Sequence, residues 1–148
     1  MKRNYVGKRL LRRRDILAKD NSEQADIHVA IIFADDEKMQ GLNRRFRKEG
    51  GVTDVLAFPI NEELEDGVLF LGEIVVNRQQ ARRQAQEYEV SEEEEIARLI
   101  IHGALHLLGY NDEARKDKQE MEEVQERIVK KLKIPAKGWS ASGGKSPK

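Results

Sequence analysis

The chain has 148 residues, no cysteine, and equal numbers of basic and acidic side chains, 27 of each, so its formal net charge is zero. The lack of cysteine excludes a disulfide framework and a thiolate metal site, and no apolar run reaches the about 20 residues that would span a bilayer. We therefore expect a cytoplasmic protein with no membrane partner. The length favours one domain with a sizeable core, which we place at residues 1–134, followed by a disordered tail at 135–148.

The charged residues are spread unevenly along the chain. Basic clusters stand at Lys8-Arg9, Arg12 to Arg14 and Arg44 to Lys48, whereas acidic residues dominate 62–66 and 92–95. A one-sided basic face could bind phosphate groups even though the total charge is zero. Such clusters also occur on solvated helix surfaces, so the sequence leaves both interpretations open.

The first half of the chain predicts two helices and three strands. Apolar residues at helical spacing indicate a basic helix at about residues 8–19, and Asp35 or Asp36 is suited to cap a second helix that runs to about Phe46. A Gly-Gly pair at 50–51 breaks the chain after it. β-Branched and aromatic residues predict strands at these ranges: 27–33, 53–58 (ended by Pro59) and 69–76.

The second half predicts three more helices. Asn77 is suited to cap the first of them, and Ser91 followed by Glu94 is a capping-box signature that opens a long helix. A charged helix follows at about residues 113–132, and Pro135 ends it. Together these elements predict an α/β (α+β) fold, with a central mixed sheet of three to four strands flanked by about five helices.

The run from His102 to Asp112 predicts a metal cleft at the end of the long helix. His102 and His106 are four residues apart, so both imidazoles lie on one helical face and can bind one ion. Gly109 can adopt the left-handed conformation that ends a helix, and the turn can bring Asp112 back as a third ligand. Three protein ligands with an open position are typical of a catalytic zinc site. Two histidines at this spacing are also compatible with core residues whose ring nitrogens are hydrogen-bonded. Burying both imidazoles in an apolar helix without partners would be costly.

Gly103 argues against peptide hydrolysis. In zinc proteases with a His-Glu-x-x-His motif, the glutamate beside the first histidine is the general base. Glycine takes that position here. The chain therefore keeps a metzincin-like spacing of ligands without the protease base.

With these motifs placed, the chain resembles the YbeY family of bacterial endoribonucleases from about Ile27 to Leu132. The segment His-Gly-Ala-Leu-His-Leu-Leu-Gly-Tyr, which starts at His102, is similar to the family's His-Gly-x-Leu-His-Leu-x-Gly-Tyr-Asp-His. Three further segments also resemble family patterns. At 43–47, Asn-Arg-Arg-Phe-Arg is similar to the family's Asn-x-x-Tyr-Arg. At 53–59, Thr-Asp-Val-Leu-Ala-Phe-Pro is similar to Pro-Thr-Asp-Val-Leu-Ser-Phe-Pro, and at 71–74, Leu-Gly-Glu-Ile is similar to Leu-Gly-Asp-Ile.

The resemblance implies a metal-dependent endoribonuclease that prefers single strands and acts in 3′-end maturation of small-subunit rRNA and in ribosome quality control. It implies zinc as the cofactor, single-stranded and ribosomal RNA rather than DNA as the substrate, and proteins of the small ribosomal subunit as partners. It also implies a functional arginine at Arg47, which would hold the scissile phosphate and stabilise charge in the transition state. From the residues alone, Arg47 would be a surface arginine at the end of a helix.

The chain departs from the family pattern at the third ligand. The family has histidine at the position of Asp112, and Asn111 replaces the family's aspartate. A carboxylate is a harder, anionic ligand that binds zinc at roughly 2.0–2.2 Å, so the metal preference could shift toward Mn²⁺ or Mg²⁺. Between Arg47 and Thr53, Lys-Glu-Gly-Gly-Val replaces the family's Gly-Lys-Asp-x-Pro, which leaves RNA contacts in that loop open.

Two further carboxylates are candidates for the site. Asp54 could orient a ligand histidine through its second ring nitrogen, as carboxylates near metal ligands often do. It could equally be an ordinary aspartate of a turn or strand edge. Glu73, on a strand of the same sheet, could line the metal cleft.

Two alternative functions remain open at this point. The chain could be a generic metallohydrolase, against which Gly103 argues. It could also be a non-catalytic ribosome assembly factor whose metal is structural, and the carboxylate at Asp112 keeps that alternative open.

Overall fold

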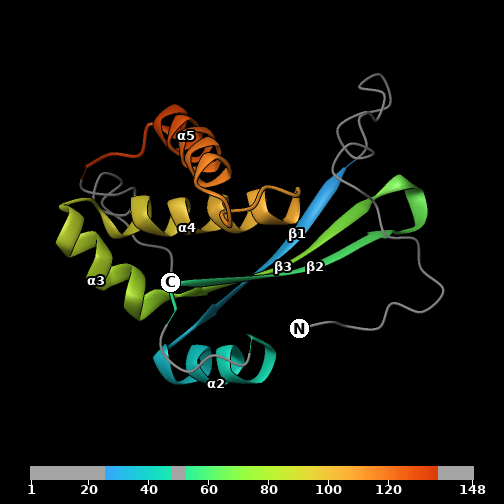
Figure 1. The fold of residues 1–148 in the computed structure, drawn as a ribbon, viewed down its shortest axis with the longest axis horizontal. Coiled ribbons are helices and arrows are strands. Elements are labelled where there is room, and N and C mark those ends of the chain that lie inside the picture. Colours follow the sequence, from blue (N-terminus) through green and yellow to red (C-terminus); the bar gives the residue numbers. More distant parts are fainter. Residues whose placement is uncertain (1–25, 48–52, 137–148) are drawn as a thin grey trace.

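The computed structural model of the chain describes residues 26–47 and 53–136 (Figure 1). Three predicted features lie outside these residues: the helix at about 8–19, the Gly-Gly break at 50–51, and residues 137–148 of the tail. In chain order the elements are β1 (Ile27–Ala34), α2 (Asp36–Arg47), β2 (Val55–Glu63), the 3-10 turn η2 (Glu65–Gly67), β3 (Leu69–Asn77), α3 (Arg78–Tyr88), α4 (Glu92–Leu107) and α5 (Arg115–Leu132).

The three strands form one mixed sheet in the order β1-β3-β2. β1 and β3 run parallel, whereas β2 and β3 pair antiparallel and are joined through η2. α4 covers one face of the sheet and α2 the other, while α3 and α5 pack against α4 (Figure 1). None of the helices in the described residues combines the length and apolar character needed to cross a bilayer. The structure confirms the predicted α/β fold, with four α-helices in the described residues instead of about five.

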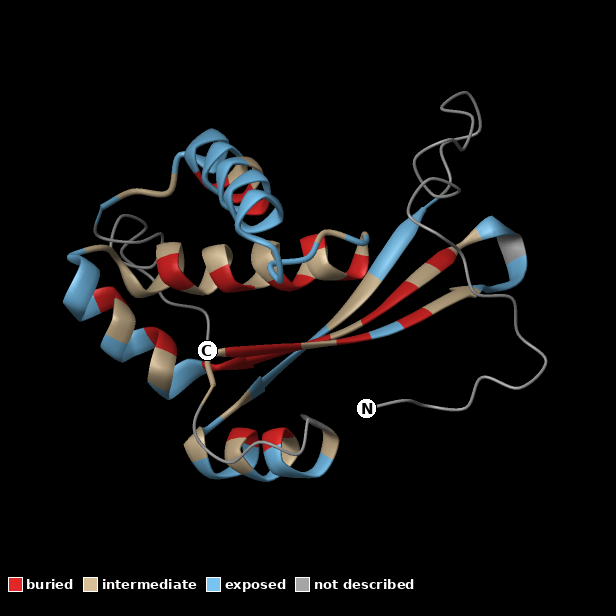
Figure 2. Ribbon diagram, in the orientation of Figure 1, coloured by how far each residue is buried: buried red, intermediate tan, exposed pale blue. Residues whose placement is uncertain are grey.

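Two hydrophobic clusters fill the space between the sheet and the helices on its two faces (Figure 2). On the α4 side the buried members are Val55, Leu69, Leu71, Ile74, Val76, Ala81, Leu99 and Leu107. On the α2 side they are Met39, Leu56, Phe58 and Val75. Neighbouring residues of a strand point to opposite faces, so Ile74 packs toward α4 and Val75 toward α2. Each large apolar side chain contributes roughly 1.5–3 kcal/mol when fully buried, so both helices are held firmly on the sheet.

The prediction that Pro59 ends its strand is wrong. β2 continues through Pro59 to Glu63. Proline cannot donate a hydrogen bond, and strands tolerate it at sheet edges and at bulges. β2 is an edge strand, and its pairing with β3 shifts register between Pro59 and Glu62. The irregularity accommodates the proline, and the strand goes on beyond it.

Two helices begin at capping residues that the sequence predicts. Asp35 Oδ1 accepts a hydrogen bond from the Lys38 amide at 2.9 Å, at the beginning of α2. Ser91 Oγ accepts one from the Glu94 amide at 3.1 Å, at the beginning of α4. Each cap satisfies a backbone donor that the helix leaves unpaired, and its loss typically costs about 1 kcal/mol. The beginning of the helix that carries the histidines is therefore encoded locally.

Asn77 ties three segments together at the end of β3. Its side chain is fully buried, and its Oδ1 accepts a hydrogen bond from the Gln80 amide at 3.1 Å, which caps α3. Its Nδ2 donates to Asp36 Oδ1 at 2.8 Å and to the Thr53 carbonyl oxygen at 3.2 Å. A buried amide is costly unless it is hydrogen-bonded. These bonds therefore fix the beginnings of α2 and α3 and the residues that precede β2.

Gly72 allows β2 and β3 to approach closely. Its φ is 152°, and a Cβ atom there would overlap the backbone carbonyl of Phe58. We expect Gly72→Ala to lower the free energy of unfolding by about 3 kcal/mol, because the backbone of one strand would have to move. Urea unfolding measures this change, and a variant as stable as the wild type would contradict the predicted overlap.

Gly41→Ala is the matched control. Gly41 lies on the exposed side of α2, with open space where its Cβ would be. Alanine at that position should raise stability by about 0.5–1 kcal/mol, because glycine loses more backbone entropy in a helix.

Candidate metal centre

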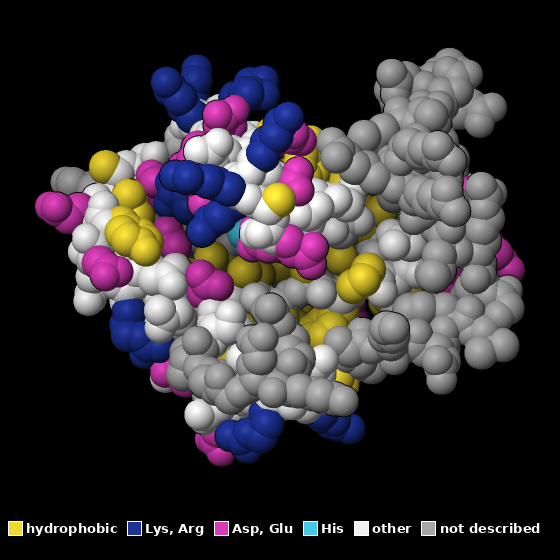
Figure 3. Space-filling view, viewed as in Figure 1, with side chains coloured by type: hydrophobic (Ala, Val, Ile, Leu, Met, Phe, Trp, Pro, Cys, Tyr) yellow, Lys and Arg dark blue, Asp and Glu magenta, His cyan; other side chains and the backbone are white. Residues whose placement is uncertain are grey.

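α4 presents two histidines on one side. His102 and His106 are one helical turn apart, with their Nε2 atoms 3.1 Å apart and their ring centroids 4.7 Å apart. Both side chains are partly exposed, and Figure 3 shows a small area of histidine surface beside a group of lysine and arginine side chains. Both Nε2 atoms are therefore placed to bind one ion that solvent can reach.

The chain turns sharply after α4 and returns Asp112 to the histidines. Gly109 has a φ of 100°, which is the left-handed conformation predicted for the residue that ends the helix. The Tyr110 amide donates to the Leu105 carbonyl oxygen at 3.0 Å and closes the turn. Asp112 Oδ2 then lies 3.8 Å from His106 Nε2. The glycine turn thus places a carboxylate beside the two imidazoles.

The structure brings together the three ligands that the sequence predicts. One ligand atom from each of His102, His106 and Asp112 lies within 4.8 Å of the other two. Neighbouring ligand atoms of a tetrahedral zinc ion are about 3.3 Å apart when each bond is roughly 2.0 Å long. The two histidines have nearly this separation already. The Asp112 side chain is 47% exposed, so it has room to close on an ion.

The second ring nitrogen of His106 shows how that ring is protonated. His106 Nδ1 lies 3.2 Å from the carbonyl oxygen of Tyr110. A carbonyl oxygen only accepts, so Nδ1 carries the proton, and in the neutral ring Nε2 presents a lone pair. That lone pair faces the Asp112 carboxylate, which also offers only electron pairs when ionised. A neutral imidazole and a carboxylate side by side are a suitable pair of ligands for a divalent cation.

Sequence reasoning missed the residue that contacts the second ring nitrogen of His102. His102 Nδ1 lies 2.8 Å from Oε1 of Gln125, a residue of α5. Gln125 is only 8% exposed and lies between Met121 and Val129, which are buried on the same helix. These three residues are spaced four apart. A polar residue within an apolar helical stripe was therefore the signal that could have identified it.

The three candidate ligands line a cavity of about 430 Å³ that α4 and β2 enclose. This volume is within the range of roughly 300–1,000 Å³ that is usual for ligand sites. Because solvent reaches the ligand atoms from the cavity, an ion held there would keep an open position, as in catalytic sites. The cavity is lined by Thr53, Asp54, Val55, Leu56, Ala57, Phe58, His102, Gly103, His106 and Asp112.

Asp54 lies on the wall of this cavity, but it is not the residue that orients a ligand histidine. The structure gives those contacts to Gln125 and to the Tyr110 carbonyl. The Asp54 backbone carbonyl accepts a hydrogen bond from the Asn77 amide at 2.9 Å. That bond holds Asp54 at the beginning of β2, where it lines the cleft.

Gly103 packs where α4 crosses the sheet. A Cβ atom at Gly103 would lie 2.7 Å from Ile74 Cγ2 and 3.2 Å from Ile74 Cγ1. These distances are too short for ordinary contacts, so a larger residue would push α4 away from β3. The glutamate base of zinc proteases therefore has no place at this position.

Glu73 does not line the metal cavity. It borders a separate cavity of about 220 Å³ on the α2 side of the sheet. The register of β3 with β1 shifts between His28 and Val29, and this leaves Leu71 as an extra residue in β3. An extra residue reverses the alternation of side chains along a strand. Glu73 and Leu71 consequently face opposite sides, and the prediction for Glu73 fails for that reason.

Arg47 is the last residue of α2, and its side chain lies outside the described part of the structure. The ring of the preceding residue, Phe46, makes an edge-to-face contact with Phe58, with 5.5 Å between centroids. Phe58 belongs to the segment of β2 that lines the metal cavity. The C-terminal end of α2 therefore lies beside the edge strand that forms the cavity wall, although α2 covers the opposite face.

Comparisons with known proteins point to one family. The family model described as endoribonuclease YbeY matches residues 7–133. Proteins named endoribonuclease YbeY include one from Thermodesulfovibrio yellowstonii, 39% identical over 71% of this chain and 67% of the relative. Another, from Desulforamulus reducens, is 41% identical over 74% of each chain. The solution structure of a Thermotoga maritima protein is 35% identical and has a TM-score of 0.51, covering 74% of this chain and 70% of that one.

The family match spans the helix with the two histidines, the glycine turn and the strand that forms the cavity wall. The relatives share more than a third of their residues with the chain over at least two thirds of their own length. The chain therefore belongs to the endoribonuclease YbeY family.

Proposed function

We propose that this protein is a metal-dependent endoribonuclease that cuts single-stranded RNA and acts in 3′-end maturation of small-subunit rRNA and in ribosome quality control. The observation that carries metal dependence is the convergence of His102, His106 and Asp112 on an open cavity. The reaction class rests on the family, whose members are named endoribonucleases. The proposed site of action is the cytoplasm, with proteins of the small ribosomal subunit as partners.

The proposed cofactor is one Zn²⁺ ion per chain, with Mn²⁺ or Mg²⁺ as alternatives because Asp112 is a hard oxygen ligand. His102 and His106 would hold the ion through Nε2, and Asp112 through a carboxylate oxygen. A divalent cation bound there supplies Lewis-acid stabilisation to a phosphodiester. The residues around it keep the imidazoles oriented and leave one side of the site open to the substrate.

Cleavage of matched oligonucleotides by the purified protein tests this function. Single-stranded RNA should be cut in the presence of zinc, whereas duplex RNA and single-stranded DNA of the same sequence should remain intact. A chelator added before the substrate should stop cleavage, and an excess of zinc should restore it. Cleavage that survives chelation would contradict the proposed metal dependence, and equal cutting of DNA would contradict the proposed substrate.

Arg47→Ala should lower the rate of RNA cleavage by about a hundredfold or more and leave bound zinc unchanged. In the proposed role, the guanidinium holds the scissile phosphate through two parallel hydrogen bonds and stabilises charge in the transition state. Arg47→Lys should recover little activity, because an ammonium group cannot make the paired contact. Initial cleavage rates and elemental analysis of the same samples measure both expectations.

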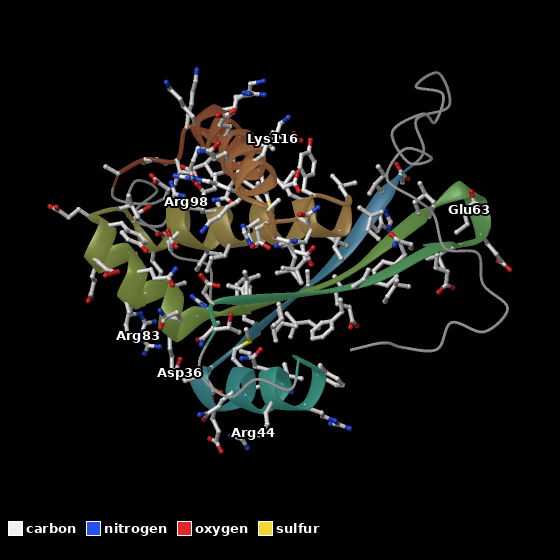
Figure 4. All side chains as sticks on the ribbon, viewed as in Figure 1. Asp36, Arg44, Glu63, Arg83, Arg98 and Lys116 are labelled. Carbon is white, nitrogen blue, oxygen red and sulfur yellow. The ribbon has the colours of Figure 1, made fainter. Side chains whose placement is uncertain are left out.

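Arg44→Ala is the control for the Arg47 variants. Arg44 is an exposed residue of the same helix (Figure 4), and its loss removes the same charge. That variant should cut RNA at close to the wild-type rate. If Arg47→Ala also cuts RNA at the wild-type rate, Arg47 has no role in the reaction.

The second candidate function is that of a non-catalytic ribosome assembly factor with a structural metal. Asp112 favours it, because a carboxylate stands where the family pattern has a third histidine. Cosedimentation with small ribosomal subunits that survives His102→Ala, together with no cleavage of any RNA tested, would support this function. Proteolysis is disfavoured, since Gly103 packs against Ile74 and leaves no room for the glutamate base.

A further inference from the structure

Gln125 is the polar member of the three buried residues of α5. Its amide makes hydrogen bonds at both ends. Oε1 lies 2.8 Å from His102 Nδ1, and Nε2 donates to Glu126 Oε2 at 3.1 Å. A buried amide is costly unless both of its polar ends have partners. The two contacts therefore hold the amide in one place, between a ligand histidine and a carboxylate.

Glu126 is itself held by an arginine of α4. Arg98 Nε donates to Glu126 Oε2 at 2.8 Å, and Arg98 Nη2 donates to Oε1 at 3.0 Å, which is the paired geometry of a strong ion pair. Arg98 also contacts Glu94 and Glu95, so it is fixed from its own helix as well. Figure 4 shows Arg98 on α4 beneath α5. The hydrogen bonds from Arg98 hold the pKa of Glu126 below its ordinary value, so Glu126 stays an ionised acceptor.

This anchoring decides which way the Gln125 amide points. A carboxylate only accepts hydrogen bonds, so the NH₂ end of the amide must face Glu126. A flipped amide would place Oε1 against the carboxylate oxygen and NH₂ against His102. In the observed orientation Oε1 faces His102 Nδ1. That ring nitrogen must therefore carry the proton, and in the neutral ring His102 Nε2 presents a lone pair.

We propose that Gln125 is a positioning residue, and that the chain of contacts from Arg98 through Glu126 and Gln125 fixes the tautomer of His102 with Nε2 free to bind the metal ion. Partners of this kind, on the far nitrogen of a ligand histidine, typically contribute about 10–100-fold to metal affinity. The identity of His102 as a ligand rests on the proposed function. The tautomer does not, because it is inferred from the contacts of the Gln125 amide with His102 Nδ1 and Glu126.

The tautomer can be measured in the metal-free protein. Long-range ¹H–¹⁵N correlation spectra, recorded well above the ordinary histidine pKa of about 6.5, distinguish a protonated ring nitrogen from one with a lone pair. His102 in the wild type should show a proton on Nδ1 and a lone pair on Nε2. A proton on Nε2 would overturn the proposal, without any variant being made.

Gln125→Leu removes the acceptor at nearly the same volume. We expect His102 to lose its single tautomer and zinc affinity to fall about 10–100-fold. The double variant Gln125→Glu/Glu126→Gln keeps an acceptor for His102 and reverses the direction of the bond between residues 125 and 126. It should restore the Nδ1–H tautomer. Gln119→Leu, at an exposed position of the same helix, is the control and should change neither quantity.

Zinc affinity and tautomer together separate this proposal from the proposed function. If Gln125→Leu leaves both the His102 spectrum and the zinc affinity unchanged, the proposal is overturned. If the wild type binds no zinc but His102 still shows the single tautomer that Gln125→Leu abolishes, the positioning role stands and the metal-dependent function fails. If Gln125→Leu does not fold, the wild-type spectrum and the double variant still decide the question.

Discussion

Replacing His106 with alanine should reduce RNA cleavage by about a thousandfold or more. In the proposed site His106 supplies one of the three ligand atoms, and its Nε2 lies 3.1 Å from His102 Nε2 and 3.8 Å from Asp112 Oδ2. Without it, only two of the three candidate ligands remain. A catalytic cation is worth several kcal/mol of charge stabilisation in the transition state. About 4 kcal/mol corresponds to roughly a thousandfold in rate.

Initial rates at saturating zinc measure the effect, with circular dichroism to show that the variant folds. Alanine is the best helix former, so α4 should not be weakened by the change itself. His28→Ala is the control, because His28 is an exposed histidine of β1 outside the candidate metal-binding group. It should cut RNA at close to the wild-type rate. A folded His106→Ala protein with normal activity would rule out the proposed metal site.

Zinc affinity should separate two substitutions of Asp112. Four-ligand structural zinc sites bind with about 10–16 kcal/mol, so one ligand is worth roughly 3 kcal/mol, or about a hundredfold in affinity. Asp112→Ala should lose affinity by about that factor. Asp112→His should keep tight binding, because it supplies the third histidine of the family pattern. It should also prefer Zn²⁺ over Mn²⁺ more strongly than the wild type, since imidazole is a softer ligand than carboxylate.

Competition with a chelating dye gives these affinities for both metals. Asp117→Ala is the control, because Asp117 is an exposed aspartate of α5 that is not part of the candidate metal-binding group. Zinc binding by Asp112→Ala as tight as that of the wild type would show that Asp112 is not a ligand. The site would then depend on the two histidines and a group outside the predicted set.

The parts of the site that the sequence predicts are those encoded over short distances. His102 and His106 share a face because one helical turn separates them, and Gly109 turns the chain because it takes a left-handed conformation. Asp112 follows within the same turn. The cap at Ser91 is local in the same sense, since its partner is three residues away. Such features depend on the neighbouring sequence and little on the rest of the fold.

The features that the sequence does not predict depend on how distant segments pair. Gln125 meets His102 only because α5 packs against α4, and no local spacing relates residues 23 apart. Glu73 faces the opposite side because β3 has an extra residue in its pairing with β1, which becomes visible only in the register. Pro59 stays within β2 because that strand lies at the edge of the sheet. All three depend on the order and alignment of elements in the folded chain.

Anomalous diffraction at the zinc absorption edge, from crystals grown with zinc, tests the central claim most directly. The account predicts one strong peak that lies roughly 2.0–2.2 Å from His102 Nε2, His106 Nε2 and a carboxylate oxygen of Asp112. The peak should border the cavity that α4 and β2 enclose. No peak among these three side chains, or a zinc ion bound elsewhere while Asp112 points into solvent, would contradict it.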